Sequence, residues 1–244
     1  MSKKNKVVIL AVGSLCLAVA AVVLWNRLSA LRIENDWEQQ RRVGKKLAKE
    51  GRYDVAERHL EAALKDAETF GKTDPRLDES LNDLAGVYVA LGKHYDSATL
   101  YLRSLEMRVQ FGGASDPNVA RTLYALANAY RAQGVFDTAE GLYNQALAAW
   151  QQGPEPEHPE VAKTLQGLAN LYHDLGRYDE AEPLYMRALA VSEKALGPDH
   201  LDVAAILDDY AVDLRAMNRA GEADELQKRA GAIRAAPAEG DHNE

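Results

Sequence analysis

Two asparagines, Asn128 and Asn170, stand 42 residues apart among side chains that are mainly cationic. Arg121, Arg131 and Lys163 each lie within seven residues of one of them. An asparagine amide both donates and accepts hydrogen bonds, while arginine and lysine pair with carboxylates. Together these residue types can hold the backbone and the acidic groups of an extended peptide, which is the chemistry of binding rather than of catalysis.

Residues that could perform catalysis or hold a metal form no recognised pattern. The six histidines are scattered, and the sequence contains no HExxH, GxSxG, P-loop or GxGxxG motif. The neighbouring carboxylates Asp208 and Asp209 fit a solvated helix face better than an acid–base pair. Cys16 is the only cysteine, which excludes internal disulfides and cysteine-based zinc clusters. The sequence therefore predicts neither an enzyme nor a bound cofactor or metal.

The distribution of charge excludes another class of function. Residues 1–32 carry five basic residues and no acid, so residues 33–244 hold 24 basic against 37 acidic residues, a net charge of −13. Proteins that bind nucleic acid through its phosphates need a basic face. We therefore predict no nucleic-acid partner.

The elements that must position the two asparagines repeat every 42 residues. The spacing recurs in several sets of residues: Asp74, Asp116 and His158 before proline; Leu81, Leu123, Leu165 and Leu207; Ala85, Ala127, Ala169 and Ala211; Gly92, Gly134 and Gly176. Within a unit the apolar residues follow the i, i+3, i+4, i+7 spacing of a helix, stop at the glycine, and resume in a second helix. One helix pair cannot bury both of its apolar stripes, so successive pairs must stack.

The order of large and small residues within a unit resembles the tetratricopeptide repeat. The residues that carry this resemblance in one unit are Leu165, Leu168, Ala169, Tyr172, Gly176, Ala181, Tyr185 and Ala188. The 42-residue spacing is similar to that of kinesin-light-chain-type repeats. The resemblance implies an all-α, right-handed superhelical solenoid of about five helix pairs. Its expected domain is 37–236, with repeats near 37–70, 78–111, 120–153, 162–195 and 204–237, followed by a disordered acidic tail, 237–244.

In such an array, the first helix of each pair lines the concave side. Eight side chains of the two middle units lie off the packing stripe there and form the predicted peptide groove: Arg121, Tyr124, Asn128, Arg131, Lys163, Gln166, Asn170 and His173. The family resemblance implies that asparagine, lysine and arginine at these positions hold peptides. We predict a protein or peptide partner with an acidic or carboxylate-ended segment. The alternatives are that these side chains are merely solvated, or that Arg131 pairs with a neighbouring acid.

The N-terminus has the pattern of a membrane segment. Residues 7–25 contain nineteen consecutive uncharged, mostly apolar residues, which as a helix would be about 28 Å long, close to the thickness of a bilayer core. A basic flank, 1–6, precedes this segment and Trp25 ends it. The pattern predicts an uncleaved transmembrane helix or signal anchor in contact with the lipid bilayer, joined to the repeats by a linker, 26–36. The alternative is a signal peptide cleaved near Ala18-Val19-Ala20, which would release a secreted soluble repeat protein.

These observations favour a membrane-anchored protein–protein interaction scaffold. The N-terminal lysines favour a cytoplasmic N-terminus, as in a single-pass protein of the bacterial inner membrane with its repeats in the periplasm. An alternative is a self-associating structural or assembly protein of the cell envelope.

Overall fold

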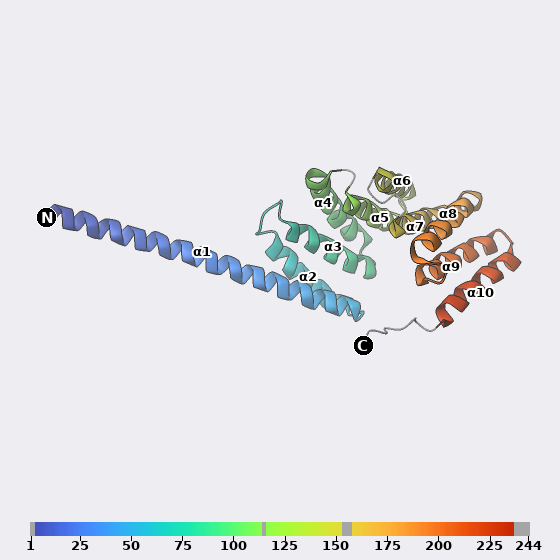
Figure 1. Cartoon of the computed structure of the whole chain (residues 1–244), viewed down its shortest axis with the longest axis horizontal. Coiled ribbons are helices and arrows are strands. Elements are labelled where there is room, and N and C mark those ends of the chain that lie inside the picture. The colour runs from blue at the N-terminus through green and yellow to red at the C-terminus, as the bar shows by residue number, and fades with distance from the viewer. Residues whose placement is uncertain (1–2, 114–115, 153–157, 237–244) are drawn as a thin grey trace. The chain divides into compact units, whose positions relative to one another are not determined.

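The computed structural model describes residues 3–113, 116–152 and 158–236, with side chains from residue 20 onward. Within these ranges the chain forms ten α-helices and no strand (Figure 1). The predicted tail, 237–244, lies outside the described residues. The helices fall into two compact units, 1–91 and 92–244, which are considered separately.

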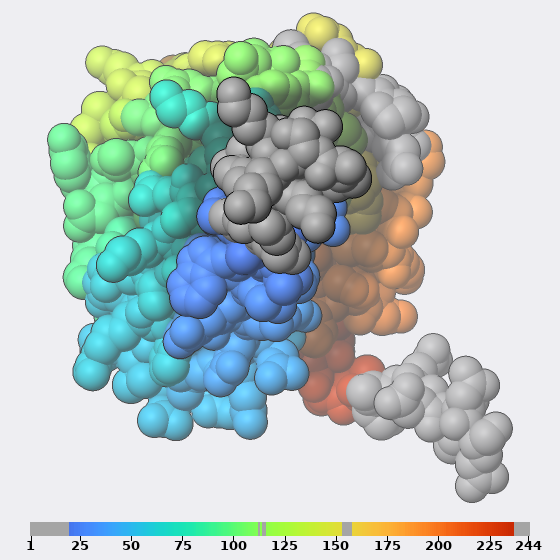
Figure 2. Space-filling model, turned by 90° about the vertical axis from the view of Figure 1, so that its left-hand side faces the viewer, coloured from blue at the N-terminus to red at the C-terminus, as the bar shows by residue number. Residues whose placement is uncertain are grey.

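The first unit contains three helices, α1 (Lys3–Lys49), α2 (Tyr53–Ala67) and α3 (Pro75–Ala90). Helix α1 packs against α2, and α2 packs against α3. Figure 2 shows the side chains of α1, in blue, beside those of α2 and α3, in cyan. The segment 26–36, expected to be a linker, is helical and continuous with the rest of α1.

The second unit contains seven helices. They are α4 (His94–Gly112), α5 (Pro117–Ala132), α6 (Phe136–Gln152), α7 (Pro159–Asp174), α8 (Tyr178–Leu196), α9 (Leu201–Ala216) and α10 (Ala220–Ala235). Each helix packs against the next one in the chain, while α7 also contacts both α5 and α9. The first helices of successive pairs, α5, α7 and α9, therefore lie side by side in one layer, as the repeat pattern requires.

The helix starts show how local sequence sets the repeat. The Asp116 carboxylate accepts the backbone N–H of Asn118 ahead of α5, at 2.8 Å, with proline in the first helical turn. His158 and His200 fill the same capping position through Nδ1, which accepts a backbone N–H two residues on, at 3.1 Å and 3.0 Å. The imidazole therefore replaces the aspartate as a helix cap.

The turns between paired helices need a residue that tolerates a left-handed backbone. Gly134 and Gly176 have φ of 75° and 70° there, and Asn218 takes the corresponding turn with φ of 62°. Asparagine visits this region more readily than other non-glycine residues. The last pair therefore keeps the turn without its glycine.

The core of the second unit combines small residues with buried tyrosine rings. Tyr143 and Tyr185 are among its largest fully buried side chains, 0% and 1% exposed. The ring of Tyr143, on α6, reaches α7 at Gly167, where an added Cβ would lie only 2.7 Å from the tyrosine Cε1. The missing side chain at Gly167 therefore allows α7 to pack against this ring.

Among the residues that the structure describes, we find no helix with a stretch long and apolar enough to cross a bilayer. Most of the predicted membrane segment, 7–25, falls within residues 1–19, whose side chains are outside the described part of the chain.

Gly167→Ala tests the ring packing. The added methyl group must displace Tyr143, so we expect the free energy of unfolding to fall by about 1–3 kcal/mol. Gly141→Ala, on the exposed face of α6 with nothing within 4 Å, is the matched control. It should stabilise the protein by about 0.5–1 kcal/mol through helix propensity. Urea unfolding followed by circular dichroism measures both, and equal effects would contradict the packing.

Candidate functional site

The eight predicted groove residues lie on two adjacent helices. Arg121, Tyr124, Asn128 and Arg131 are on α5, and Lys163, Gln166, Asn170 and His173 are on α7. Arg121 is exposed, and the other seven are partly buried. The structure therefore brings the predicted residues together on one face, but the contacts of most of them are within the chain.

Both asparagines hold a buried tyrosine of their own repeat. The Tyr143 hydroxyl donates to Asn128 Oδ1 at 2.6 Å, and the Tyr185 hydroxyl donates to Asn170 Oδ1 at 2.5 Å. Burial raises the pKa of both phenols, so each hydroxyl remains a proton donor. The two asparagines thus satisfy the polar ends of core side chains, a role that the repeat pattern does not reveal.

Two polar side chains of α7 donate hydrogen bonds to a carboxylate of α9. Gln166 Nε2 and Asn170 Nδ2 both donate to Asp209 Oδ2, at 2.7 Å and 2.9 Å. The sequence predicts a solvated Asp209, but in the structure this residue joins two neighbouring repeats. Asp208 likewise contacts Arg234 of α10.

His173 contacts a fully buried carboxylate. Its Nδ1 lies 2.9 Å from Asp213 Oδ1, and Asp213 is 0% exposed. Burial raises the pKa of Asp213, and the hydrogen bond from His173 partly opposes this rise. The pair is a contact between α7 and α9, so His173 is committed to the packing of the repeats.

The basic residues of the predicted groove are mostly neutralised. Lys163 Nζ lies 3.1 Å from a carboxylate oxygen of Glu160 and 3.6 Å from one of Asp202. Arg131 Nε lies 3.6 Å from Asp174 Oδ2, the alternative that the sequence left open. Nearby carboxylates thus already partner two of the three cations that favoured an acidic ligand.

Arg121 differs from the other two cations. Its guanidinium donates to the Asn118 side chain at 3.2 Å and lies 5.7 Å from the centre of the Trp150 ring. Within the described part of the chain it has no carboxylate partner. Asn128 Nδ2 and Gln166 Oε1 also have no hydrogen-bond partner among the described residues. As far as the described residues go, these three groups can contact a ligand without losing an ion pair or a hydrogen bond inside the protein.

The same face contains a small pocket of about 120 Å³ between α7 and α9. Its lining residues come from four helices: Tyr124 of α5, Pro159, Ala162, Lys163 and Gln166 of α7, Ser192 of α8, and Asp202, Ala205 and Ile206 of α9. Elsewhere in the described ranges, no cluster of three histidine, cysteine or acidic residues is arranged to hold a metal ion.

Sequence comparison decides the family. The tetratricopeptide repeat family matches residues 41–110, 77–152, 118–194 and 160–236, which together cover most of the chain. The chain belongs to the tetratricopeptide repeat (TPR) family. It is therefore an all-helical TPR solenoid, and TPR proteins bind protein partners. No curated protein sequence matches it.

Solved structures with the same fold include kinesin-light-chain-like TPR proteins. A Podosopora anserina protein assigned as a kinesin light chain, with nearly identical TPR-like repeats, is 25% identical, with a TM-score of 0.67 over 81% of this chain and 94% of that one. BtubC from P. vanneervenii is 24% identical, with a TM-score of 0.68 over 88% and 93% of the two chains. A TPR protein of Thermus thermophilus is 23% identical, with a TM-score of 0.58 over 83% and 93%.

A double-mutant cycle tests the structural role of Asn128. Asn128→Ala leaves the buried Tyr143 hydroxyl without its acceptor, so we expect a loss of about 1–3 kcal/mol in the free energy of unfolding. In Asn128→Ala/Tyr143→Phe the loss should be clearly smaller than the sum of the two single effects. Asn144→Ala, at an exposed site on α6, is the control and should change stability by less than about 0.5 kcal/mol. Additive single effects would show that the contact carries no energy.

Proposed function

We propose that this TPR protein is a membrane-tethered scaffold that binds an extended segment of a partner protein along α5 and α7. The observation that carries the proposal is the set of available groups on this face: the Arg121 guanidinium, Asn128 Nδ2 and Gln166 Oε1. They offer donors and an acceptor on two adjacent first helices. A peptide backbone presents the complementary amide and carbonyl groups along its length.

The chemistry of the partner segment follows from which cations remain available. Carboxylates already flank Lys163 and Arg131, so an acidic group would have to compete with Glu160, Asp202 or Asp174 for them. We therefore place the acidic or carboxylate-ended part of the partner at Arg121. An arginine can hold a carboxylate through two parallel hydrogen bonds, which adds both strength and direction.

The tether is supported by the sequence of residues 7–25 and by the described part of α1 beyond it. Val22, Leu24 and Trp25 are 58%, 59% and 73% exposed, and Leu28 and Leu31 are also more than half exposed. An apolar helix that no other part of the described chain covers is stabilised by a lipid surface. We propose a single-pass anchor in a bacterial inner membrane, with the repeats in the periplasm.

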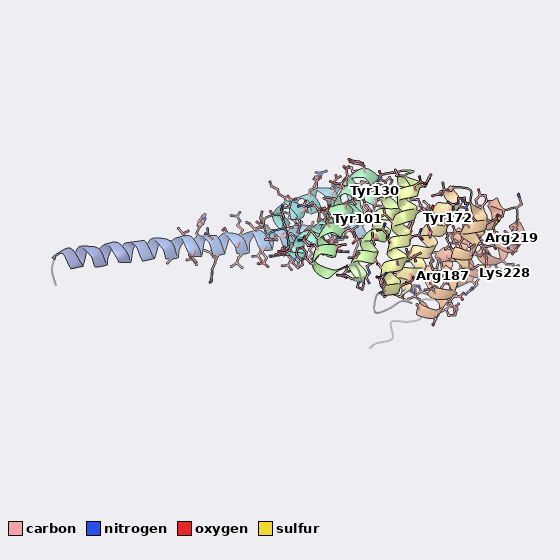
Figure 3. All side chains as sticks on the ribbon, turned by 90° about the horizontal axis from the view of Figure 1, so that it is seen from above. Tyr101, Tyr130, Tyr172, Arg187, Arg219 and Lys228 are labelled. Atoms are coloured by element: carbon pink, nitrogen blue, oxygen red, sulfur yellow. The ribbon has the colours of Figure 1, made fainter. Side chains whose placement is uncertain are left out.

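The partner-binding prediction is tested at Arg121. With the protein in its own membrane, formaldehyde crosslinking and mass spectrometry identify candidate partners, whose segments are then titrated as peptides. We expect Arg121→Gln to weaken binding of an acidic segment by about tenfold, the loss of one charge-assisted contact. Arg187→Gln is the matched control, because Arg187 is an exposed arginine on α8 (Figure 3). Equal affinities of the two variants for the acidic segment would show that the face of α5 and α7 does not bind it through Arg121.

The anchor is tested by flotation with phospholipid vesicles. We expect the full chain to float with the vesicles and to resist extraction by alkaline carbonate. A variant lacking residues 1–25 should remain in the dense fraction. The mass of the mature N-terminus separates the alternatives, because a chain that begins near residue 21 has lost its anchor and is a secreted protein. Concentration-dependent association of the shortened variant, independent of Arg121, would favour the self-assembly function instead.

A further inference from the structure

In the second unit, one position in the second helix of the repeats carries a large side chain in three helices out of four, whereas the equivalent residue on α2 of the first unit is Asp66. At 42-residue intervals the position is occupied by Arg108 on α4, Trp150 on α6, Ser192 on α8 and Arg234 on α10. Three of the four residues are therefore large, and Ser192 is the exception.

Each of the three large side chains makes contacts within the second unit, although only Trp150 is fully buried. Arg108 donates to the carbonyl of Asn118 and to the Thr122 hydroxyl, at 2.8 Å and 2.6 Å. Trp150 is 2% exposed and stacks on the His158 ring at 4.8 Å. The side chains of Arg108 and Trp150 thus extend from the second helix of one repeat to the start of the next repeat.

The last of the three is also an arginine. Arg234 contacts the Asp208 carboxylate and the carbonyl of Ala204. The positions that correspond to Ala204 and Asp208 one repeat earlier are Ala162 and Gln166, and both of these line the pocket beside Ser192. The Ala204 carbonyl thus has an equivalent beside Ser192, while the Asp208 carboxylate is replaced by the neutral amide of Gln166, whose Oε1 can also accept a hydrogen bond.

The pocket lies where the side chain of Ser192 is too short to fill this space. Ser192 is 0% exposed and lines the pocket of about 120 Å³, and its Oγ has no hydrogen-bond partner. This volume is well above that needed for one water molecule and below that of a typical small-molecule site. It suits a single side chain that enters from outside.

The polar groups of the pocket select the kind of side chain. Ser192 Oγ, Gln166 Oε1 and the Asp202 carboxylate can all accept hydrogen bonds. An aromatic ring would cover these acceptors without satisfying them, which costs free energy. A guanidinium instead supplies five N–H donors in one plane.

The charges around the pocket are also compatible with a guanidinium ligand. Lys163 is the single cation among the lining residues, and it is flanked by the carboxylates of Asp202, itself a lining residue, and of Glu160. Asp202 balances the charge of Lys163 within the lining, and Glu160, which lies outside the lining, also pairs with this lysine, so the pocket presents no unpaired cation that would repel a guanidinium. We propose that the Ser192 pocket binds an arginine side chain of the partner protein. The inference rests on the proposed function for the partner that brings this arginine, but the pocket itself can be tested without the partner.

The test uses the full chain in detergent and methylguanidinium as the probe. NMR signals of the Ala162, Ala205 and Ile206 methyl groups report occupation of the pocket. We expect a saturable shift of these signals with methylguanidinium, and about tenfold weaker binding of N-methylurea, a neutral compound of similar shape. Ser192→Arg should abolish probe binding, because the guanidinium of the new side chain would occupy the pocket. Ala190→Arg adds the same charge at an exposed site on α8 and should leave probe binding unchanged.

Two other outcomes of this experiment would contradict the proposed arginine pocket. Shifts with indole but not with methylguanidinium would overturn the assignment to arginine, and no shift with either would overturn the pocket as a binding site. If Ser192→Arg does not fold, as judged by circular dichroism, Gln166→Leu/Asp202→Asn replaces it and should weaken probe binding by about tenfold or more. If methylguanidinium does not bind but partner binding depends on Arg121, only the proposed arginine pocket is wrong. If methylguanidinium binds but partner binding does not depend on Arg121, only the proposed function is wrong.

Discussion

The structure depends on close contact between small residues on one helix and a tyrosine ring from the helix before it. A helix pair of this length cannot bury both of its apolar stripes alone, so it is stable only against its neighbours. Gly167 and the buried alanines leave room for the rings of Tyr143 and Tyr185, which are completely enclosed. Any larger residue at Gly167 would separate α6 from α7, and the face made by α5 and α7 would lose its geometry.

Burying tyrosine creates a polar requirement that decides what the surface residues can do. Each enclosed hydroxyl needs an acceptor, and Asn128 and Asn170 provide it. Asp209 of α9 then accepts hydrogen bonds from the amide N–H groups of Gln166 and Asn170 on α7, and Asp213 contacts His173. Residues that could grip a ligand in a single isolated repeat are therefore partly used to join one repeat to the next. What remains for binding is smaller and more specific, and it centres on Arg121.

The sequence was sufficient for the helix pairs of the repeats, but not for the helical segment 26–36 or for the site, and the reason is physical. The 42-residue period and the helical stripes are local signals, so they predict the helix pairs, the Asp116 cap and the turn at Gly134. The contacts between Asn170 and Asp209 join different repeats at a spacing other than 42 residues. A comparison of equivalent positions cannot reveal such a contact. Comparing position 192 with its equivalents does show an unusual residue, but only the structure shows that a pocket results from it.

Departures from the repeat therefore separate into two kinds. At the positions of Asn170 and Tyr185, the last repeat has Val212 and Gln227, so the acceptor and the hydroxyl are lost together, and Gln227 accepts a hydrogen bond from Arg215 instead. This departure leaves no buried tyrosine hydroxyl without an acceptor. Ser192 is different, because its hydroxyl stays buried without a partner and a pocket remains beside it, although Ile206, which lines this pocket, is larger than Thr122 and Thr164 at the equivalent positions. A repeat protein that compensates for one exception but leaves another open has a vacant space there, and a side chain from another molecule is the simplest occupant of that space.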